Sequence, residues 1–194
     1  MIRYGQQDIT DEDILAVTDV LRSDFLTQGD KVPEFEKRIS AFVNAKYCFA
    51  VNSATSALHI ACLALDLGPG DIAWTSPNTF VASANCPLYC GAEVDFVDID
   101  AGTGNLSLPR LAKKLDHAER SGKLPKVIIA VHFAGSSVDM KTLKGLVDPY
   151  GIRIIEDASH ALGGEFRDEK IGHCSYSDMA VFSFHPVKMI TTGE

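Results

Sequence analysis

Residues 126–133 read Lys-Val-Ile-Ile-Ala-Val-His-Phe, a nearly continuous run of apolar and mostly β-branched side chains. A strand with one face in water alternates apolar and polar residues, whereas a strand covered on both faces is apolar throughout. This run therefore predicts a strand in the interior of a parallel sheet. A second short run, residues 152–155, is interrupted only by Arg153 and predicts another buried strand.

Helices and strands alternate along the rest of the sequence. Apolar residues at helical spacing predict helices over residues 9–23, 33–43, 53–66, 80–89, 108–115 and 140–150. Apolar or alternating runs predict further strands over residues 47–51, 71–75, 93–99 and 180–184. This alternation indicates an α/β fold, in which a mostly parallel sheet has helices on both faces and right-handed crossover connections.

The first two predicted helices each begin at a capping signal and carry an apolar stripe. Thr10 precedes three acidic residues, as an N-cap does, and Pro33 suits a first helical turn. The stripe residues, which we expect at core spacing, are Ile14, Val17, Leu21, Phe35, Ile39 and Phe42.

Composition and charge restrict the class of protein. Hydrophobic residues make up 46% of the 194 residues and charged residues 23%, a balance that excludes wholesale disorder and suits one domain with a sizeable core. The 18 Lys and Arg against 26 Asp and Glu give a net charge of −8. This acidic balance argues against nucleic-acid binding, which needs clustered basic residues.

No part of the sequence indicates a membrane-bound or secreted protein. No stretch approaches the roughly 18 apolar residues of a membrane span, and the acidic N-terminal region has no signal-peptide core. The five cysteines are an odd number, and Cys86 and Cys90 do not have the C-x-x-C spacing of zinc or redox sites. We therefore expect reduced thiols, a cytoplasmic location and no membrane partner.

Three polar clusters directly follow predicted strands. They are residues 52–56 (Asn-Ser-Ala-Thr-Ser), 156–160 (Glu-Asp-Ala-Ser-His) and 183–188 (Ser-Phe-His-Pro-Val-Lys). In parallel α/β sheets the ligand binds beyond the carboxyl ends of the strands. The sequence therefore predicts a ligand site built from these clusters.

The first cluster opens a helix and has two interpretations. A helix N-terminus carries unpaired N–H groups and the positive end of the helix dipole, so a phosphate could bind there beside the Thr55 and Ser56 hydroxyls. Alternatively, Ser53 is an ordinary helix cap. The glycine patterns of Walker and dinucleotide sites do not occur here.

The second cluster places Asp157 at the end of a buried strand. A buried carboxylate needs a cationic partner, which could be a metal, an arginine or the protonated nitrogen of a heterocycle. Glu156 should point to the opposite face of the strand. His160 could contact the same ligand or be a structural histidine. A metal site formed with His173 lacks any recognised ligand spacing, so we expect no metal.

The third cluster contains Lys188, flanked by apolar residues. Lysines are usually solvated surface charges, but one partly removed from water has a lowered pKa, and its neutral amine can attack a carbonyl. An anion site, a strand-end aspartate and an activated lysine together match the phosphate, ring nitrogen and aldehyde of pyridoxal phosphate.

These residues resemble those of fold-type-I pyridoxal-phosphate enzymes, and more narrowly the DegT/StrS-type nucleotide-sugar aminotransferases. Within that family the likeness is greatest to the 4-aminotransferases that make UDP-4-amino-4,6-dideoxy-N-acetyl-β-L-altrosamine in pseudaminic acid biosynthesis. The matching segments, spread over nearly the whole chain, are residues 25–29 (FLTQG), 52–58 (NSATSAL), 77–82 (PNTFVA), 156–161 (EDASHA), 182–188 (FSFHPVK) and 192–194 (TGE).

The resemblance implies a role for each matched position. Lys188 would condense with the cofactor aldehyde and later move a proton between the cofactor carbon and the sugar carbon, and Asp157 would keep the ring nitrogen protonated. The remaining implied cofactor contacts are Phe80 on the ring, His160 near the O3′ side, and Thr55, Ser56 and Ser183 on the phosphate. The implied substrate contacts are Tyr4, Asp24, Phe25, Leu26, Thr27 and Gln28.

The resemblance also implies a reaction, in which glutamate gives its amino group to a UDP-linked 4-keto-6-deoxy sugar. Relatives continue beyond residue 194 and act as dimers, so we expect residues 1–194 to be the N-terminal part of the cofactor-binding large domain, without the rest of that domain or the C-terminal small domain. We expect this piece to be inactive alone and the full-length protein to be a homodimer.

Other readings stay open at this point. A non-catalytic sugar-nucleotide-binding homologue would keep the fold without the chemistry. An aminotransferase for a different keto sugar would keep both the fold and the chemistry. Some relatives are dehydratases with histidine at the lysine position, a reading that Lys188 disfavours.

Overall fold

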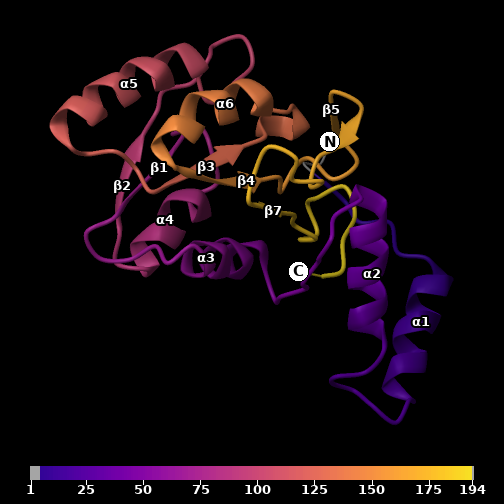
Figure 1. The fold of residues 1–194 in the computed structure, drawn as a ribbon. Coiled ribbons are helices and arrows are strands. Elements are labelled where there is room, and N and C mark those ends of the chain that lie inside the picture. Colours follow the sequence, from indigo (N-terminus) through magenta and orange to yellow (C-terminus); the bar gives the residue numbers. More distant parts are fainter. Residues whose placement is uncertain (1–4, 194) are drawn as a thin grey trace.

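The two apolar runs form adjacent strands in the interior of one parallel sheet. In the computed structural model, which describes residues 5–193, β3 (Val127–Val131) is buried along its whole length and pairs in parallel with β4 (Arg153–Asp157). The other strands are β1 (Ile72–Thr75), β2 (Glu93–Phe96) and β7 (Met179–Val181). Their order is β2-β1-β3-β4-β7, and every pairing is parallel (Figure 1).

Helices cover both faces of this sheet, as the sequence predicts. Side chains alternate along β3, so that Ile128 joins one core cluster and Ile129 the other. The first cluster lies beneath α5 (Leu108–Ser121) and α6 (Met140–Val147), and the second beneath α3 (Ala54–Ala64) and α4 (Ala82–Tyr89) (Figure 1). The α/β prediction is confirmed.

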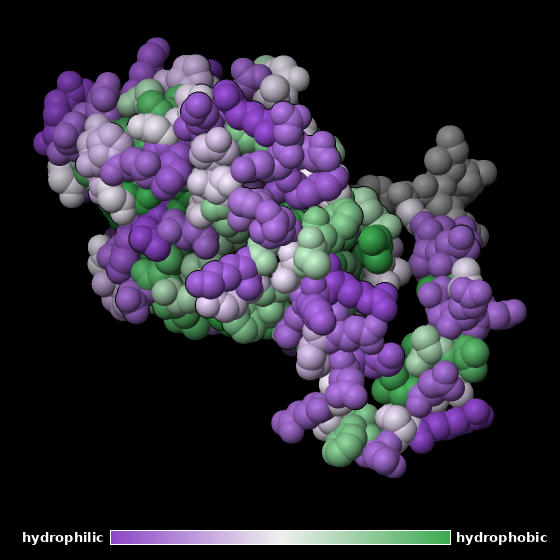
Figure 2. Space-filling view, turned by 45° about the vertical axis from the view of Figure 1, so that its right-hand side comes forward, coloured by the Kyte–Doolittle hydropathy of each residue, from purple (hydrophilic) through white to green (hydrophobic). Residues whose placement is uncertain are grey.

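The two N-terminal helices form where the sequence predicts them but do not pack as predicted. In α1 (Asp11–Leu21) the capping box of Thr10 and Asp13 is present, yet none of the helix's residues is buried. Its stripe is more than half exposed, with Val17 at 62%. The stripe of α2 (Lys31–Val43) is only partly covered: the Phe35 ring packs edge-on against the Phe184 ring and Val43 is buried, whereas Phe42 is 50% exposed. The pair of helices stands out from the body with hydrophobic side chains on its surface (Figure 2).

One further expectation fails, and one element was not predicted. Residues 47–51 form no strand, since they pass between α2 and α3 without reaching a sheet edge, and the Ala50 N–H bonds to the Glu36 carboxylate at 2.8 Å instead. An unpredicted hairpin joins β5 (Glu165–Phe166) to β6 (Glu169–Lys170). Its turn uses Arg167 and Asp168 at positive φ, where the glycine or asparagine signal of such turns is absent.

Short 3₁₀ turns, η1 (Phe133–Gly135) and η2 (Asp148–Tyr150), follow β3 and α6. Across residues 5–193, no helix is long and apolar enough to cross a membrane. All five cysteines are free thiols. Burial is the main cause that raises the pKa of Cys62 to about 12 and that of Cys86 to about 11, so both stay protonated near neutral pH.

Candidate active site

Asp157 is the last residue of β4 and lies at the carboxyl edge of the sheet. It is only 5% exposed. Its Oδ2 accepts a hydrogen bond from Ser83 Oγ at 2.6 Å, and its Oδ1 accepts from Ser159 Oγ at 2.6 Å and from the Ser159 N–H at 3.2 Å. Because Ser83 belongs to α4, the carboxylate faces the α3–α4 layer. Ser83 and Ser159 thus supply three hydrogen bonds to this buried carboxylate.

Lys188 lies beyond β7, in the segment that returns to the same edge. It is half-buried, and its backbone N–H bonds to the His185 carbonyl at 2.9 Å. Burial lowers the pKa of the Lys188 ammonium, and the Asp157 carboxylate offsets part of that effect. The structure therefore brings the predicted lysine within electrostatic reach of the predicted aspartate.

His160 is the third member of this group. Burial is the largest cause that lowers its pKa, followed by the positive charge of Lys188, whereas Asp157 acts in the opposite direction. The imidazole is therefore mostly neutral at pH 7. Asp157, His160 and Lys188, from two polar clusters of the sequence, thus share one electrostatic environment.

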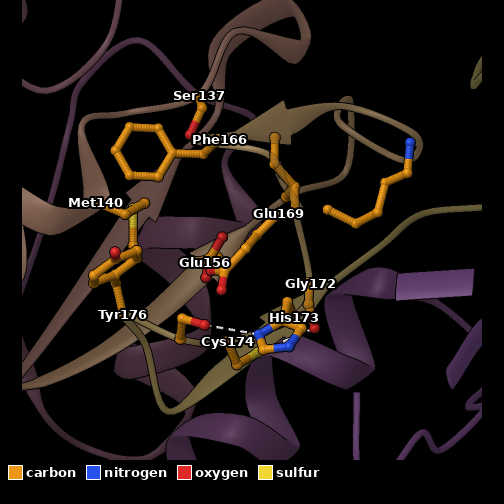
Figure 3. Close-up of a pocket in the computed structure, with 12 residues that line it drawn as sticks. Ser137, Met140, Glu156, Phe166, Glu169, Gly172, His173, Cys174 and Tyr176 are labelled. Atoms are coloured by element: carbon orange, nitrogen blue, oxygen red, sulfur yellow. Dashed lines mark hydrogen bonds between the residues drawn. The ribbon is translucent and has the colours of Figure 1, made fainter. Parts of the chain in front are cut away.

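Glu156 takes no part in this group, as the strand alternation predicts. It faces the α5–α6 layer, where its carboxylate accepts hydrogen bonds from His132 Nε2 at 2.7 Å and from the Ser177 hydroxyl. Figure 3 shows Glu156 pointing into a small pocket between Tyr176 and His173. The pocket has a volume of about 20 Å³, about enough for one water molecule.

The N-terminus of α3 carries the predicted anion-binding residues. Ser53 is the N-cap, and its Oγ accepts the Ser56 N–H at 3.1 Å, so the capping interpretation is correct. Capping satisfies one N–H and leaves the first turn free to act on an anion as well. The Thr55 carbonyl accepts a hydrogen bond from Cys86 of α4 at 3.2 Å. This contact joins the start of α3 to α4, the helix whose Ser83 bonds to Asp157.

Phe80 and Ser183 flank the same edge of the sheet. Phe80 lies between β1 and α4 and is 69% exposed, so its ring is free to contact a ligand. Ser183 lies two residues after Val181, which pairs with Asp157 between β7 and β4. Its Oγ accepts the His185 N–H at 3.4 Å.

The predicted substrate segment lies elsewhere in this chain. Asp24 to Gln28 form the loop between α1 and α2, and all five residues are exposed. Figure 1 shows this loop at the end of the two helices away from the sheet. Tyr4 lies outside the described residues. The substrate contacts of these six positions therefore stay predictions.

Three hydroxyl residues at the site were not identified from the sequence. Ser83 and Ser159 bond to Asp157, and Thr79 Oγ1 lies 2.7 Å from Ser83 Oγ. One signal was present: Thr79 and Ser83 are four residues apart, which is the spacing of one helical face.

A large cleft also opens beside the site, and neither Asp157 nor Lys188 lines it. It has a volume of about 930 Å³ and is bounded by α2, α3 and the residues around β7, among them Phe184 and Thr192. The candidate site is therefore assigned from the chemistry at the strand ends.

Comparisons with known proteins identify the family of this chain. The model of the DegT/DnrJ/EryC1/StrS aminotransferase family matches residues 7–194. The UDP-4-amino-4,6-dideoxy-N-acetyl-beta-L-altrosamine transaminase of Campylobacter jejuni subsp. jejuni serotype O:23/36 is 43% identical over 194 residues, which are 100% of this chain and 50% of that protein. The chain spans about half the length of the curated relatives it matches.

Solved structures give the same result. Helicobacter pylori PseC, an aminotransferase of pseudoaminic acid biosynthesis, matches with a TM-score of 0.90 and 34% identity over 99% of this chain and 50% of its own. A putative sugar aminotransferase of Streptococcus pneumoniae in its PMP form matches with a TM-score of 0.92 and 33% identity over 100% and 50%. The chain belongs to the DegT/DnrJ/EryC1/StrS aminotransferase family.

Proposed function

We propose that this chain provides the cofactor-binding part of a pyridoxal-phosphate-dependent nucleotide-sugar aminotransferase. The observation that carries the proposal is the placement of Lys188, partly removed from water, beside the buried Asp157 at the carboxyl edge of a parallel sheet. Identity of 43% along the whole chain to a UDP-sugar transaminase supports a UDP-linked 4-keto-6-deoxy sugar as amino acceptor. Glutamate is the proposed amino donor.

The side chains at the candidate site fit the chemical groups of the cofactor. Asp157 would hold the ring nitrogen, Lys188 would bind at the aldehyde, and the first turn of α3 with Thr55 and Ser56 would receive the phosphate. Ser183, His160 and Phe80 complete the proposed contacts. When bound, pyridoxal phosphate supplies an electron sink for removal of a proton from carbon.

The side chains then have separable tasks. A lowered pKa leaves more of Lys188 as the free amine, which can bind a carbonyl carbon and later take up and return a proton. Three hydrogen-bond donors orient the Asp157 carboxylate, which would pair with the ring nitrogen of the cofactor. His160, mostly neutral, can donate or accept one hydrogen bond beside them.

A labelling experiment tests the cofactor assignment. The protein is mixed with pyridoxal 5′-phosphate, reduced with borohydride and digested, and the modified peptide is identified by mass spectrometry. We expect the label on Lys188 and its loss in Lys188→Ala. The matched control is Lys144→Ala, which removes a surface lysine of α6 that pairs with Asp148. Label spread equally over surface lysines would contradict the assignment.

A turnover experiment tests the reaction. We propose that the full-length protein, as a homodimer, transfers the amino group of glutamate to the keto sugar, and that residues 1–194 alone do so far more slowly. Equal turnover by both would contradict the proposed dependence on the remaining sequence. Sugar-nucleotide binding with no Lys188-dependent chromophore would favour a non-catalytic binding protein.

A further inference from the structure

A chain of hydroxyl groups leads from the loop before α4 to Asp157. Ser83 is fully buried and donates its hydroxyl proton to Asp157 Oδ2 at 2.6 Å. A serine hydroxyl has one proton to give. In the 2.7 Å contact between Thr79 and Ser83, the donor must therefore be Thr79. The order of donation is thus Thr79 to Ser83 to Asp157.

The number of donors on Asp157 shows where a further donor can bind. Each carboxylate oxygen has about two acceptor positions. Among the described residues, the Ser159 N–H and hydroxyl both bond to Oδ1, whereas Oδ2 receives only the Ser83 hydroxyl. The acceptor position that remains is therefore on Oδ2, the oxygen that Ser83 holds.

The chain of hydroxyl groups also joins two parts of the proposed cofactor site. Thr79 is adjacent in sequence to Phe80, the proposed ring contact, and Ser83 lies on the first turn of α4. The hydroxyl chain therefore fixes the loop that carries Phe80 relative to the carboxylate. Hydrogen bonds to a charged group in a buried site are among the stronger ones, so the loss of one should be measurable.

We propose that Ser83, supported by Thr79, is a positioning residue that orients Asp157 so that the free acceptor position of Oδ2 receives the protonated ring nitrogen of the cofactor. This inference rests on the proposed function. Ser83 does not touch the cofactor and acts only through Asp157.

The test compares two cofactors. One is pyridoxal 5′-phosphate, and the other is its 1-deaza analogue, in which a C–H group replaces the ring nitrogen. Dissociation constants of both are measured for the unsubstituted protein, Ser83→Ala and Thr79→Val. Ser177→Ala is the matched control, because it removes the hydroxyl that bonds to Glu156 on the opposite face of β4. Urea unfolding of the cofactor-free proteins records any change in stability.

For Ser83→Ala, we expect the dissociation constant of pyridoxal phosphate to rise about 10-fold, as for the loss of one hydrogen bond to a charged group, and that of the deaza analogue to stay the same. Thr79→Val should show a smaller rise for pyridoxal phosphate alone, and it carries the test if Ser83→Ala does not fold. Ser177→Ala should change neither constant.

Equal losses for both cofactors, or reduced stability with unchanged constants, would show a merely structural role and overturn the inference while leaving the proposed function standing. If the unsubstituted protein shows no Lys188-dependent binding of pyridoxal phosphate, both proposals fall.

Discussion

Replacement of His132 by alanine should strongly destabilise the fold, because the imidazole satisfies two buried groups. His132 is completely buried, and its Nδ1 accepts the Val138 N–H at 3.1 Å. Its proton is therefore on Nε2, which donates to Glu156 at 2.7 Å. The pair is thus a neutral histidine bound to a carboxylate.

The cost follows from these two bonds. A hydrogen bond to a charged group contributes about 1.5–3 kcal/mol, and a buried N–H left without an acceptor costs about 1–3 kcal/mol. We expect His132→Ala to lower the free energy of unfolding by about 3–5 kcal/mol, which is also the range for removal of one partner from a buried pair. Such a loss is a large fraction of the whole stability of a domain, about 5–15 kcal/mol.

The assay is urea unfolding followed by circular dichroism, at constant m-value, for His132→Ala, Glu156→Leu and the double variant. In this cycle the two single losses should sum to more than the loss of the double variant, because each single change leaves a buried polar group unpaired. His132→Gln, which keeps a donor and an acceptor, should lose less than His132→Ala. A loss below about 1 kcal/mol for His132→Ala would refute the reasoning.

Three further predictions concern a charge, a cap and a glycine. The folded-state pKa of Lys188 is lowered from the ordinary 10.5, so the unfolded chain binds more protons at this residue. Lys188→Met should therefore stabilise the fold near neutral pH, and this gain should fade as the pH rises to about 10.5. The midpoints of urea unfolding at several pH values measure the effect. Asp139 caps α6 by accepting the Thr142 N–H, so Asp139→Ala should cost about 1 kcal/mol in thermal unfolding and Asp139→Asn only a few tenths. Gly135 has φ +86° and leaves no room for a Cβ, which would lie 2.7 Å from the His160 carbonyl oxygen. Gly135→Ala should therefore reduce both the stability of the fold and its affinity for pyridoxal phosphate. An unchanged affinity would show that the His160 segment does not contribute to the site.

The sheet could be predicted from the sequence because its signals are local. The apolar run of β3 shows burial on both faces, and the alternation of elements indicates the parallel order. The polar clusters made Asp157 and Lys188 candidates for the site because ligands of parallel sheets bind at strand ends. Residues 47–51 were wrongly predicted as a strand because β propensity cannot show whether a sheet edge is available for pairing.

The apolar stripe of α1 shows a second limit of local signals. Helical spacing correctly predicts the helix, including its capping box, yet Val17 remains 62% exposed. The period of a pattern shows that a face can pack, but not which surface covers it. In the same way, Ser83 could be placed on a helix but not against Asp157, because that contact joins positions 74 residues apart.

The register of β4 explains why two adjacent carboxylates have different partners. Successive side chains point to opposite faces, so Glu156 meets His132 in the α5–α6 layer while Asp157 meets Ser83 in the α3–α4 layer. A shift of one residue would exchange the two faces and place glutamate beside Lys188. The His132 N–H bonds to the Asp157 carbonyl at 3.1 Å, and the His132 side chain binds Glu156. The residue that follows β3 therefore contacts β4 at both positions, Asp157 through its backbone N–H and Glu156 through its side chain, and these two contacts fix the register of the two strands at this end.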